Sequence, residues 1–77
     1  MPKIIPTNWE TQVKIFEKYG CKYLRTKGDH MIFHYEGALR PVVIPKYKEI
    51  PITIIKNNMN VVKMDRDKYF DLLKATN

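Results

Sequence analysis

The chain has 77 residues, and its 14 lysines and arginines outnumber 8 acidic residues to give a formal net charge of +6. A chain this short buries only about 60% of the surface that its unfolded form exposes, which excludes a large core and a deep active-site cavity. The positive charge favours polyanionic partners, because cations that contact phosphates release condensed counterions. RNA, DNA, an acidic membrane and an acidic protein are all compatible with this charge.

The cysteine content and the hydrophobicity of the sequence indicate in which cellular compartment the protein is expected. Cys21 is the only cysteine in the sequence, so an internal disulfide and a cysteine-based zinc site are excluded, and a reducing cytoplasm fits. Residues 1–6 hold no apolar core of signal-peptide length, and no stretch approaches the roughly 20 apolar residues that cross a bilayer. We therefore expect a cytoplasmic protein without a membrane segment, folded as a single domain over residues 1–77.

The first predicted element is a helix over residues 8–19. Thr7 and Glu10 have the N-cap and N3 spacing of a capping box, and Gly20 supplies a stop signal. Between these signals, apolar residues recur at helical spacing at Trp9, Val13 and Phe16.

Short strands are predicted next, over residues 21–26, 30–35 and 40–44. Residues 27–29 and 36–38 form the turns between them. Pro45 closes the third strand, because proline cannot donate a hydrogen bond to a ladder. Consecutive short strands with tight turns predict an antiparallel meander.

Two helices follow the strands. Pro51 suits the first turn of a helix over residues 51–62, whose apolar stripe consists of Ile52, Ile55, Met59 and Val62. The asparagines that lie off this stripe are expected to face water, and they are Asn57, Asn58 and Asn60. Asp65 is the predicted N-cap of the last helix, with Met64 and Tyr69 placed as a hydrophobic staple.

This order of elements predicts an α+β fold, a two-layer sandwich with all helices packed on one face of the sheet. The second strand alternates two sets of side chains. The more apolar set, expected to face the helices, is Met31, Phe33 and Tyr35. The other set, expected on the open face, is His30, Ile32 and His34.

His30 is the candidate catalytic residue, because it directly follows a glycine turn with basic residues close by. Imidazole takes and returns protons near neutral pH without a metal, and in a small basic protein the natural substrate is a phosphodiester. His34 lies about 13 Å further along the strand, too far for both histidines to act on one phosphate. Catalysis would therefore rest on one histidine.

Other chemistries find little support. His30, His34, Asp29 and Glu36 do not reproduce a common metal-ligand spacing, so no metal is expected. The chain contains no serine, and its three glycines form no phosphate-binding loop, so no cofactor is expected either.

Basic residues recur beside aromatic ones, a combination that neutralises phosphates and stacks on exposed bases. The candidate RNA-binding residues are Lys22, Arg25, Lys27, Lys46, Tyr47 and Lys48. Five further aromatic residues lie on predicted apolar faces and are assigned to the core: Trp9, Phe16, Phe33, Tyr69 and Phe70.

The chain resembles the HicA toxins of bacterial toxin–antitoxin systems over nearly its whole length. The matching segments are Met1-Pro2-Lys3 with Pro6, Glu17-Lys18-Tyr19-Gly20, Arg25, Lys27-Gly28-Asp29-His30, Val43-Ile44-Pro45 and Asp65-Arg66-Asp67-Lys68-Tyr69. The resemblance implies a fold like the double-stranded RNA-binding domain and ribosome-independent cleavage of mRNA. It also implies a cognate HicB-like antitoxin that covers the active surface, with His30 as the catalytic residue.

The sequence departs from the family pattern at three positions. Asp29 stands where the family usually has serine, Tyr47 where a second histidine often follows, and Lys63 where a glycine usually separates the last two helices. We expect the first to affect the surroundings of His30, the second to remove an accessory group, and the third to concern helix capping.

The residues favour a small endoribonuclease in which His30 acts as general base on a ribose 2′-hydroxyl and the product is a cyclic phosphate. Arg25 and Lys27, together with Lys22, Lys46 and Lys48, would hold the RNA backbone. Two alternatives stay open: a non-catalytic RNA-binding module of the same fold, and an interaction protein whose basic face serves an acidic antitoxin.

Overall fold

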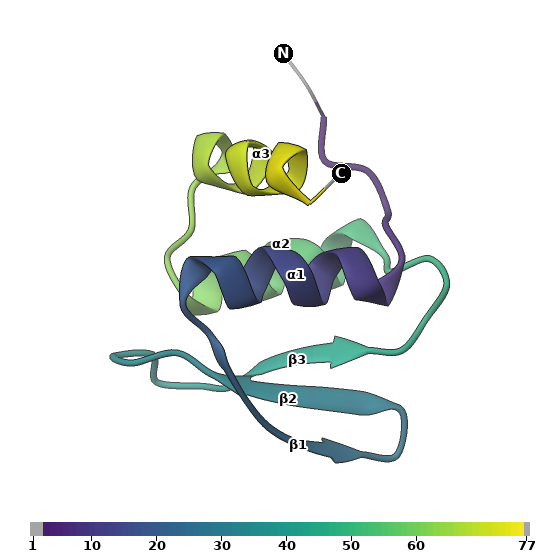
Figure 1. The fold of residues 1–77 in the computed structure, drawn as a ribbon, viewed down its shortest axis with the longest axis vertical. Helices are drawn as coiled ribbons and strands as arrows, with labels where there is room; N and C mark the ends of the chain where they lie inside the picture. The colour runs from purple at the N-terminus through teal and green to yellow at the C-terminus, as the bar shows by residue number, and fades with distance from the viewer. Residues whose placement is uncertain (1–2, 77) are drawn as a thin grey trace.

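The computed structural model describes residues 3–76; Met1, Pro2 and Asn77, the first two of which belong to the resemblance above, lie outside the described residues. In chain order the elements are α1 (Trp9–Tyr19), β1 (Lys22–Lys27), β2 (His30–His34), β3 (Val42–Pro45), α2 (Ile52–Val61) and α3 (Arg66–Ala75) (Figure 1). The strands form an antiparallel sheet in the order β1-β2-β3. This architecture confirms the predicted α+β class and is consistent with a fold like the double-stranded RNA-binding domain. Between residues 3 and 76, no helix is long and apolar enough to cross a membrane.

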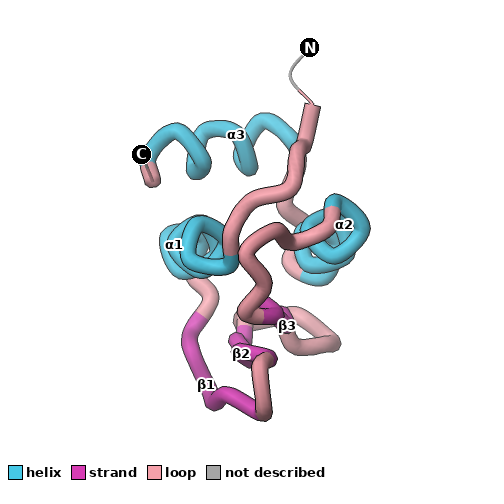
Figure 2. The backbone as a smooth tube through the Cα atoms, turned by 90° about the vertical axis from the view of Figure 1, so that its right-hand side faces the viewer, coloured by secondary structure: helices cyan, strands magenta, loops and turns pink. Residues whose placement is uncertain are grey.

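The helices lie on one side of the sheet, as predicted, but they do not all pack on it. Figure 2 shows α1 and α2 side by side next to the sheet and α3 beyond them. The buried side chains of α3 are Tyr69 and Leu72, and this helix packs on α1. The short sheet is already covered by α1 and α2, so the prediction that α3 also packs on the sheet is wrong.

The start of α1 differs in its cap from the predicted capping box. Asn8 is the N-cap, and its side-chain oxygen accepts a hydrogen bond from the Thr11 N–H at 2.8 Å. Thr7 is instead held in a β-bridge with Ile50, whose N–H donates to the Thr7 carbonyl at 2.7 Å. This bridge fixes Thr7 one residue ahead of the cap position. The predicted stop is confirmed, because Gly20 caps α1 with a φ of 120° that favours glycine.

The core lies between α1 and the sheet, and α2 and α3 close it. Its fully buried side chains include Phe33, Val42 and Ile44 from the sheet and Ile15 and Phe16 from α1. One buried polar side chain crosses this core: the Gln12 amide nitrogen donates to the Tyr69 hydroxyl at 2.9 Å and to the Thr7 hydroxyl at 2.8 Å. Gln12 therefore links α1 both to α3 and to the segment that precedes α1.

α2 is fastened to the outer edge of β3 by an asparagine that was expected to face water. Asn58 is only 7% exposed, and its amide nitrogen donates to the Val43 carbonyl at 2.9 Å. Its side-chain oxygen accepts from the Val43 N–H at 3.4 Å. A buried amide needs such partners, and here the backbone of the edge strand supplies them. The prediction holds for Asn57 and Asn60, which are exposed.

The connection between α2 and α3 contains Lys63, which stands where the family usually has glycine, and its hydrogen bonds show why this position favours glycine. The Met64 N–H donates to the Met59 carbonyl at 2.9 Å and the Lys63 N–H to the Asn60 carbonyl at 3.2 Å. This pair of bonds is a Schellman motif, in which the residue after the C-cap takes a left-handed conformation. Lys63 occupies that position with a φ of 56°. Asp65 then caps α3 as predicted, accepting from the Lys68 N–H at 2.7 Å.

Candidate functional site

A tight hairpin places His30 at the start of β2. Gly28 has a φ of 60°, as the first central residue of a two-residue type II′ turn requires, and this turn brings Lys27 and His30 into register. On the other side of β2, His30 is paired with Pro45, and the Lys46 N–H donates to the Asp29 carbonyl at 2.7 Å. The backbone of His30 is thus held between two strands.

The side chain of His30 lies on the face of the sheet that points away from α1. Phe33, of the opposite alternating set, is fully buried, whereas His30 and His34 are exposed. The predicted assignment of faces along β2 is therefore correct. Ile32, between the two histidines on the same face, is half-buried.

A β-bulge in β1 aligns three basic side chains beside β2. The register passes from Tyr23 opposite Phe33 to Arg25 opposite Ile32, so that Leu24 is the extra residue. Directly paired residues share a face. Because of the bulge, the side chains that share the face of His30 include a row of three cations, Lys22, Arg25 and Lys27, which we name the basic strip.

The loop after β3 brings Tyr47 to His30 but directs Lys46 elsewhere. The ring centroids of His30 and Tyr47 are 6.4 Å apart in an edge-on arrangement. The Tyr47 carbonyl accepts from the Trp9 N–H at 3.1 Å, which ties the loop to the start of α1. The Lys46 ammonium group lies over the Trp9 ring at 5.6 Å from its centroid. Lys48 is exposed in the same loop.

A shallow groove between the sheet and α2 adjoins His30 on the side opposite the basic strip. It has a volume of about 220 Å³ and is lined by His30, Val43, Pro45, Ile54, Asn57 and Asn58; we name it the His30 groove. Its α2 residues were not predicted as site residues. The spacing of Ile54, Asn57 and Asn58 at positions i, i+3 and i+4 is the sequence signal that places them on one helix face.

The comparison with family models reports the HicA toxin of bacterial toxin-antitoxin, matched over residues 9–63. The chain belongs to the HicA toxin family. The matched residues run from the first residue of α1 to the residue after the C-cap of α2. They contain His30, the basic strip, the loop with Tyr47 and every residue that lines the His30 groove. As a HicA toxin, the protein is the toxin of a bacterial toxin–antitoxin system and has an antitoxin as its partner. No curated protein and no solved structure matches the chain.

The three departures from the usual HicA pattern have different structural settings. Asp29 is the second residue of the hairpin turn and is exposed beside His30. Tyr47 places an aromatic ring against His30 where the family often has a second histidine. Lys63 lies next to the loop that joins β2 to β3, at the position where α2 ends. Two of the three departures therefore adjoin the candidate catalytic residue.

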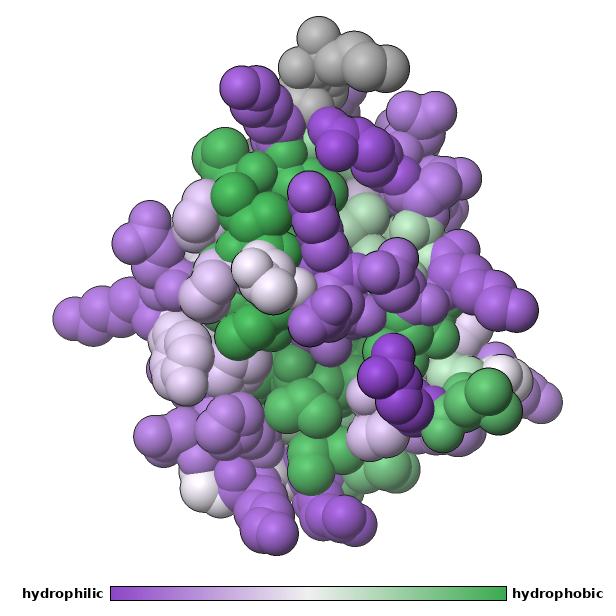
Figure 3. Space-filling view, turned by 180° about the vertical axis from the view of Figure 1, so that it is seen from behind, coloured by the Kyte–Doolittle hydropathy of each residue, from purple (hydrophilic) through white to green (hydrophobic). Residues whose placement is uncertain are grey.

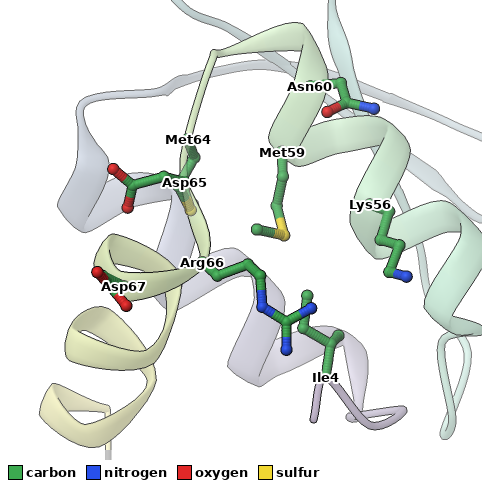
Figure 4. Close-up of a pocket in the computed structure, with 8 residues that line it drawn as sticks. All are labelled: Ile4, Lys56, Met59, Asn60, Met64, Asp65, Arg66 and Asp67. Carbon is green, nitrogen blue, oxygen red and sulfur yellow. The ribbon is translucent and has the colours of Figure 1, made fainter. Parts of the chain in front are cut away.

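A second cavity of this HicA toxin, larger than the His30 groove, lies elsewhere. It has a volume of about 550 Å³ and is formed by α2, the start of α3 and the segment before α1, with the lining residues Ile4, Lys56, Met59, Asn60, Met64, Asp65, Arg66 and Asp67 (Figure 4). In the close-up, the Arg66 side chain extends toward Ile4. None of the residues predicted for catalysis or RNA binding lines this cavity.

Cys21 carries a thiol that could in principle act as a nucleophile in the HicA fold, but it is buried, with only 5% of its surface exposed. Burial raises the pKa of its thiol from 9.0 to about 11, so the thiol stays protonated at neutral pH and is a poor nucleophile. Within residues 3–76, no group of three or more His, Cys, Asp or Glu side chains is placed to hold a metal ion.

Proposed function

We propose that this toxin is a ribosome-independent, metal-independent endoribonuclease that cleaves mRNA, with His30 as general base. The observation that carries the proposal is the pairing of His30 with Lys27 on the exposed face of the sheet, at one end of the basic strip. A proton acceptor and a row of cations on one open surface are what cleavage of an extended phosphodiester chain requires.

In the proposed reaction, His30 takes the proton of a ribose 2′-hydroxyl. The 2′-oxygen then forms a bond to the adjacent phosphorus, and the bond from phosphorus to the 5′-oxygen breaks. The leaving oxygen takes a proton from water, and the products are a 2′,3′-cyclic phosphate and a 5′-hydroxyl. No metal is needed, because imidazole accepts the proton and the neighbouring cations stabilise the charge on the phosphate.

The basic strip is assigned to the RNA backbone. Lys27 lies opposite His30 and is the cation best placed for the scissile phosphate, while Arg25 and Lys22 are placed for phosphates further along the chain. Tyr47 offers an exposed aromatic edge for a base or ribose beside His30. Lys48 extends the positive surface, and Lys46 contributes charge from its position over Trp9.

The proposed antitoxin is a HicB-like protein with an acidic surface that covers His30, Arg25 and Lys27. Covering these side chains blocks both the proton acceptor and the phosphate contacts. Opposite charges accelerate the encounter of such partners, so the complex is expected to form fast at low salt and dissociate slowly.

The decisive experiment replaces His30 by alanine. The His30→Ala variant should lose RNA cleavage and growth arrest but keep its circular dichroism spectrum, because an exposed strand residue contributes little to packing. His34→Ala is the matched control, since His34 is exposed on the same face of the same strand. Full cleavage by the His30→Ala variant would leave the non-catalytic RNA-binding module as the better interpretation. Equal losses in both variants would contradict catalysis by one histidine.

A further inference from the structure

We propose that the His30 groove binds the nucleobase next to the scissile phosphate, and that Asn57 reads the identity of this base. The inference rests on the proposed ribonuclease function and adds a specificity site to it. It starts from the different surroundings of His30 on its two sides: the basic strip along β1, and the groove between β3 and α2.

The shape and lining of the groove suit one flat base. Its volume of about 220 Å³ is below the ~300–1,000 Å³ typical of pockets for drug-sized ligands. Val43 and Ile54, both half-buried, provide apolar surface against which a base can pack, whereas Pro45 is fully buried. Figure 3, a view from behind, shows hydrophobic surface in the lower middle of this side of the molecule, with hydrophilic side chains around it.

The two asparagines of the groove have different roles. Both amide atoms of Asn58 are engaged with the Val43 backbone, so this side chain is structural. Asn57 is exposed, and its side-chain amide makes no hydrogen bond to any part of residues 3–76. An amide presents a donor and an acceptor next to each other and can pair with both groups on one edge of a base.

The two sides of His30 together define how RNA would lie. Backbone phosphates over the basic strip and a base in the groove place the intervening ribose at His30, where its 2′-hydroxyl must be for attack. A base held by apolar packing and by one amide is discriminated from the other bases mainly through that amide. Asn57 is therefore a specificity residue rather than a catalytic one.

The test compares Asn57→Ala and Asn57→Asp with the control Asn60→Ala, which changes another exposed asparagine of α2 away from His30. Each protein cleaves a long RNA of mixed sequence, and sequencing of the ends gives the base preference at the positions flanking each cut. The wild type and the control should prefer particular bases at one flanking position. Asn57→Ala should reduce that preference by about 10-fold, and Asn57→Asp, which loses the donor, should change which base is preferred.

A second measurement separates this inference from the proposed function. In the His30→Ala background, affinities are measured for short single-stranded RNAs that differ in one base, with and without Asn57→Ala. Loss of base discrimination on Asn57→Ala supports the groove even if the wild type fails to cleave RNA, an outcome that would overturn the ribonuclease proposal alone. If the base preference in cleavage and the base discrimination in binding are the same with and without Asn57→Ala, the inference that the groove binds a base is wrong. The ribonuclease proposal is unaffected by that result, because it depends on His30.

Discussion

Asn58 hydrogen-bonds both the N–H and the carbonyl of Val43, and so takes the place of a neighbouring strand at the outer edge of β3. This interaction joins α2 to the sheet beside His30. Its removal should therefore affect both the stability of the fold and the width of the His30 groove.

We expect Asn58→Ala to lower the free energy of unfolding by about 1–3 kcal/mol, because it removes both hydrogen bonds to partly buried backbone groups of Val43. Chemical denaturation measures the change. Asn60→Ala, at an exposed site on the same helix, should stay within about 0.5 kcal/mol of the wild type. Equal stability of the two variants would show that water replaces the amide at no cost and that Asn58 does not fasten α2.

Lys63→Gly should stabilise the protein by about 0.5–1 kcal/mol. The left-handed φ of 56° is unfavourable for a residue with a Cβ atom, and part of the gain is offset by the greater freedom of glycine in the unfolded chain. Thermal unfolding gives the readout, with Lys63→Ala as the control, since alanine keeps the Cβ. An unchanged or lowered melting temperature for Lys63→Gly would mean that interactions of the lysine side chain outweigh the backbone strain.

Charge reversal in the basic strip should weaken RNA binding by removing a cation that neutralises phosphate. For Lys27→Glu we expect a lower affinity for an uncleaved RNA and a shallower dependence of log K on log salt, by about 0.7 for each phosphate of a single strand that the variant no longer neutralises. The matched control is Lys14→Glu, which reverses an exposed lysine on α1 and therefore has the same net charge as Lys27→Glu. If the two variants bind RNA alike, net charge rather than the basic strip holds the RNA.

The same pair of variants tests the antitoxin surface. Lys27→Glu should also weaken the complex with the antitoxin, mainly by slowing association at low salt. Surface plasmon resonance at two salt concentrations separates the rates. Unchanged antitoxin binding together with abolished RNA binding would place the antitoxin elsewhere on the toxin.

Alkaline pH should destabilise the fold in part through Cys21. The pKa of the thiol is higher in the folded protein, at about 11, than its ordinary 9.0, so the unfolded state releases the proton first as pH rises. The associated stability is complete below about pH 9 and is lost as pH rises through 11. The difference in unfolding free energy between the wild type and Cys21→Val should therefore change between pH 8 and 11. A difference independent of pH would show that the thiol is not desolvated.

Local signals in the sequence predicted much of the fold and the position of His30. Gly20 and Asp65 mark helix ends because their conformational and capping preferences are local. The alternation along β2 placed His30 on the exposed face because burial of Phe33 fixes the register. The N-cap of α1 was misplaced by one residue, because a bridge to Ile50, distant in sequence, decides the conformation of Thr7.

The features that shape the candidate site depend on pairing between elements. The bulge at Leu24 brings Lys22 onto the face of Arg25 and Lys27, and a strict alternation within β1 would have separated them. Asn58 is polar by type but buried by its position against Val43. The bulge and the burial of Asn58 both depend on how one element is aligned with its neighbour, which the periodicity of the sequence alone does not specify.

The cations of β1 also bear on how copies of the protein meet one another. β1 is the free edge of the sheet, and an edge strand with unpaired backbone groups readily joins the edge of another copy. The bulge at Leu24 interrupts a regular ladder there, and Lys22, Arg25 and Lys27 would bring like charges together in any edge-to-edge pairing. The residues assigned to RNA thus also oppose self-association. A variant that lacks several of these charges would aggregate in addition to binding RNA more weakly.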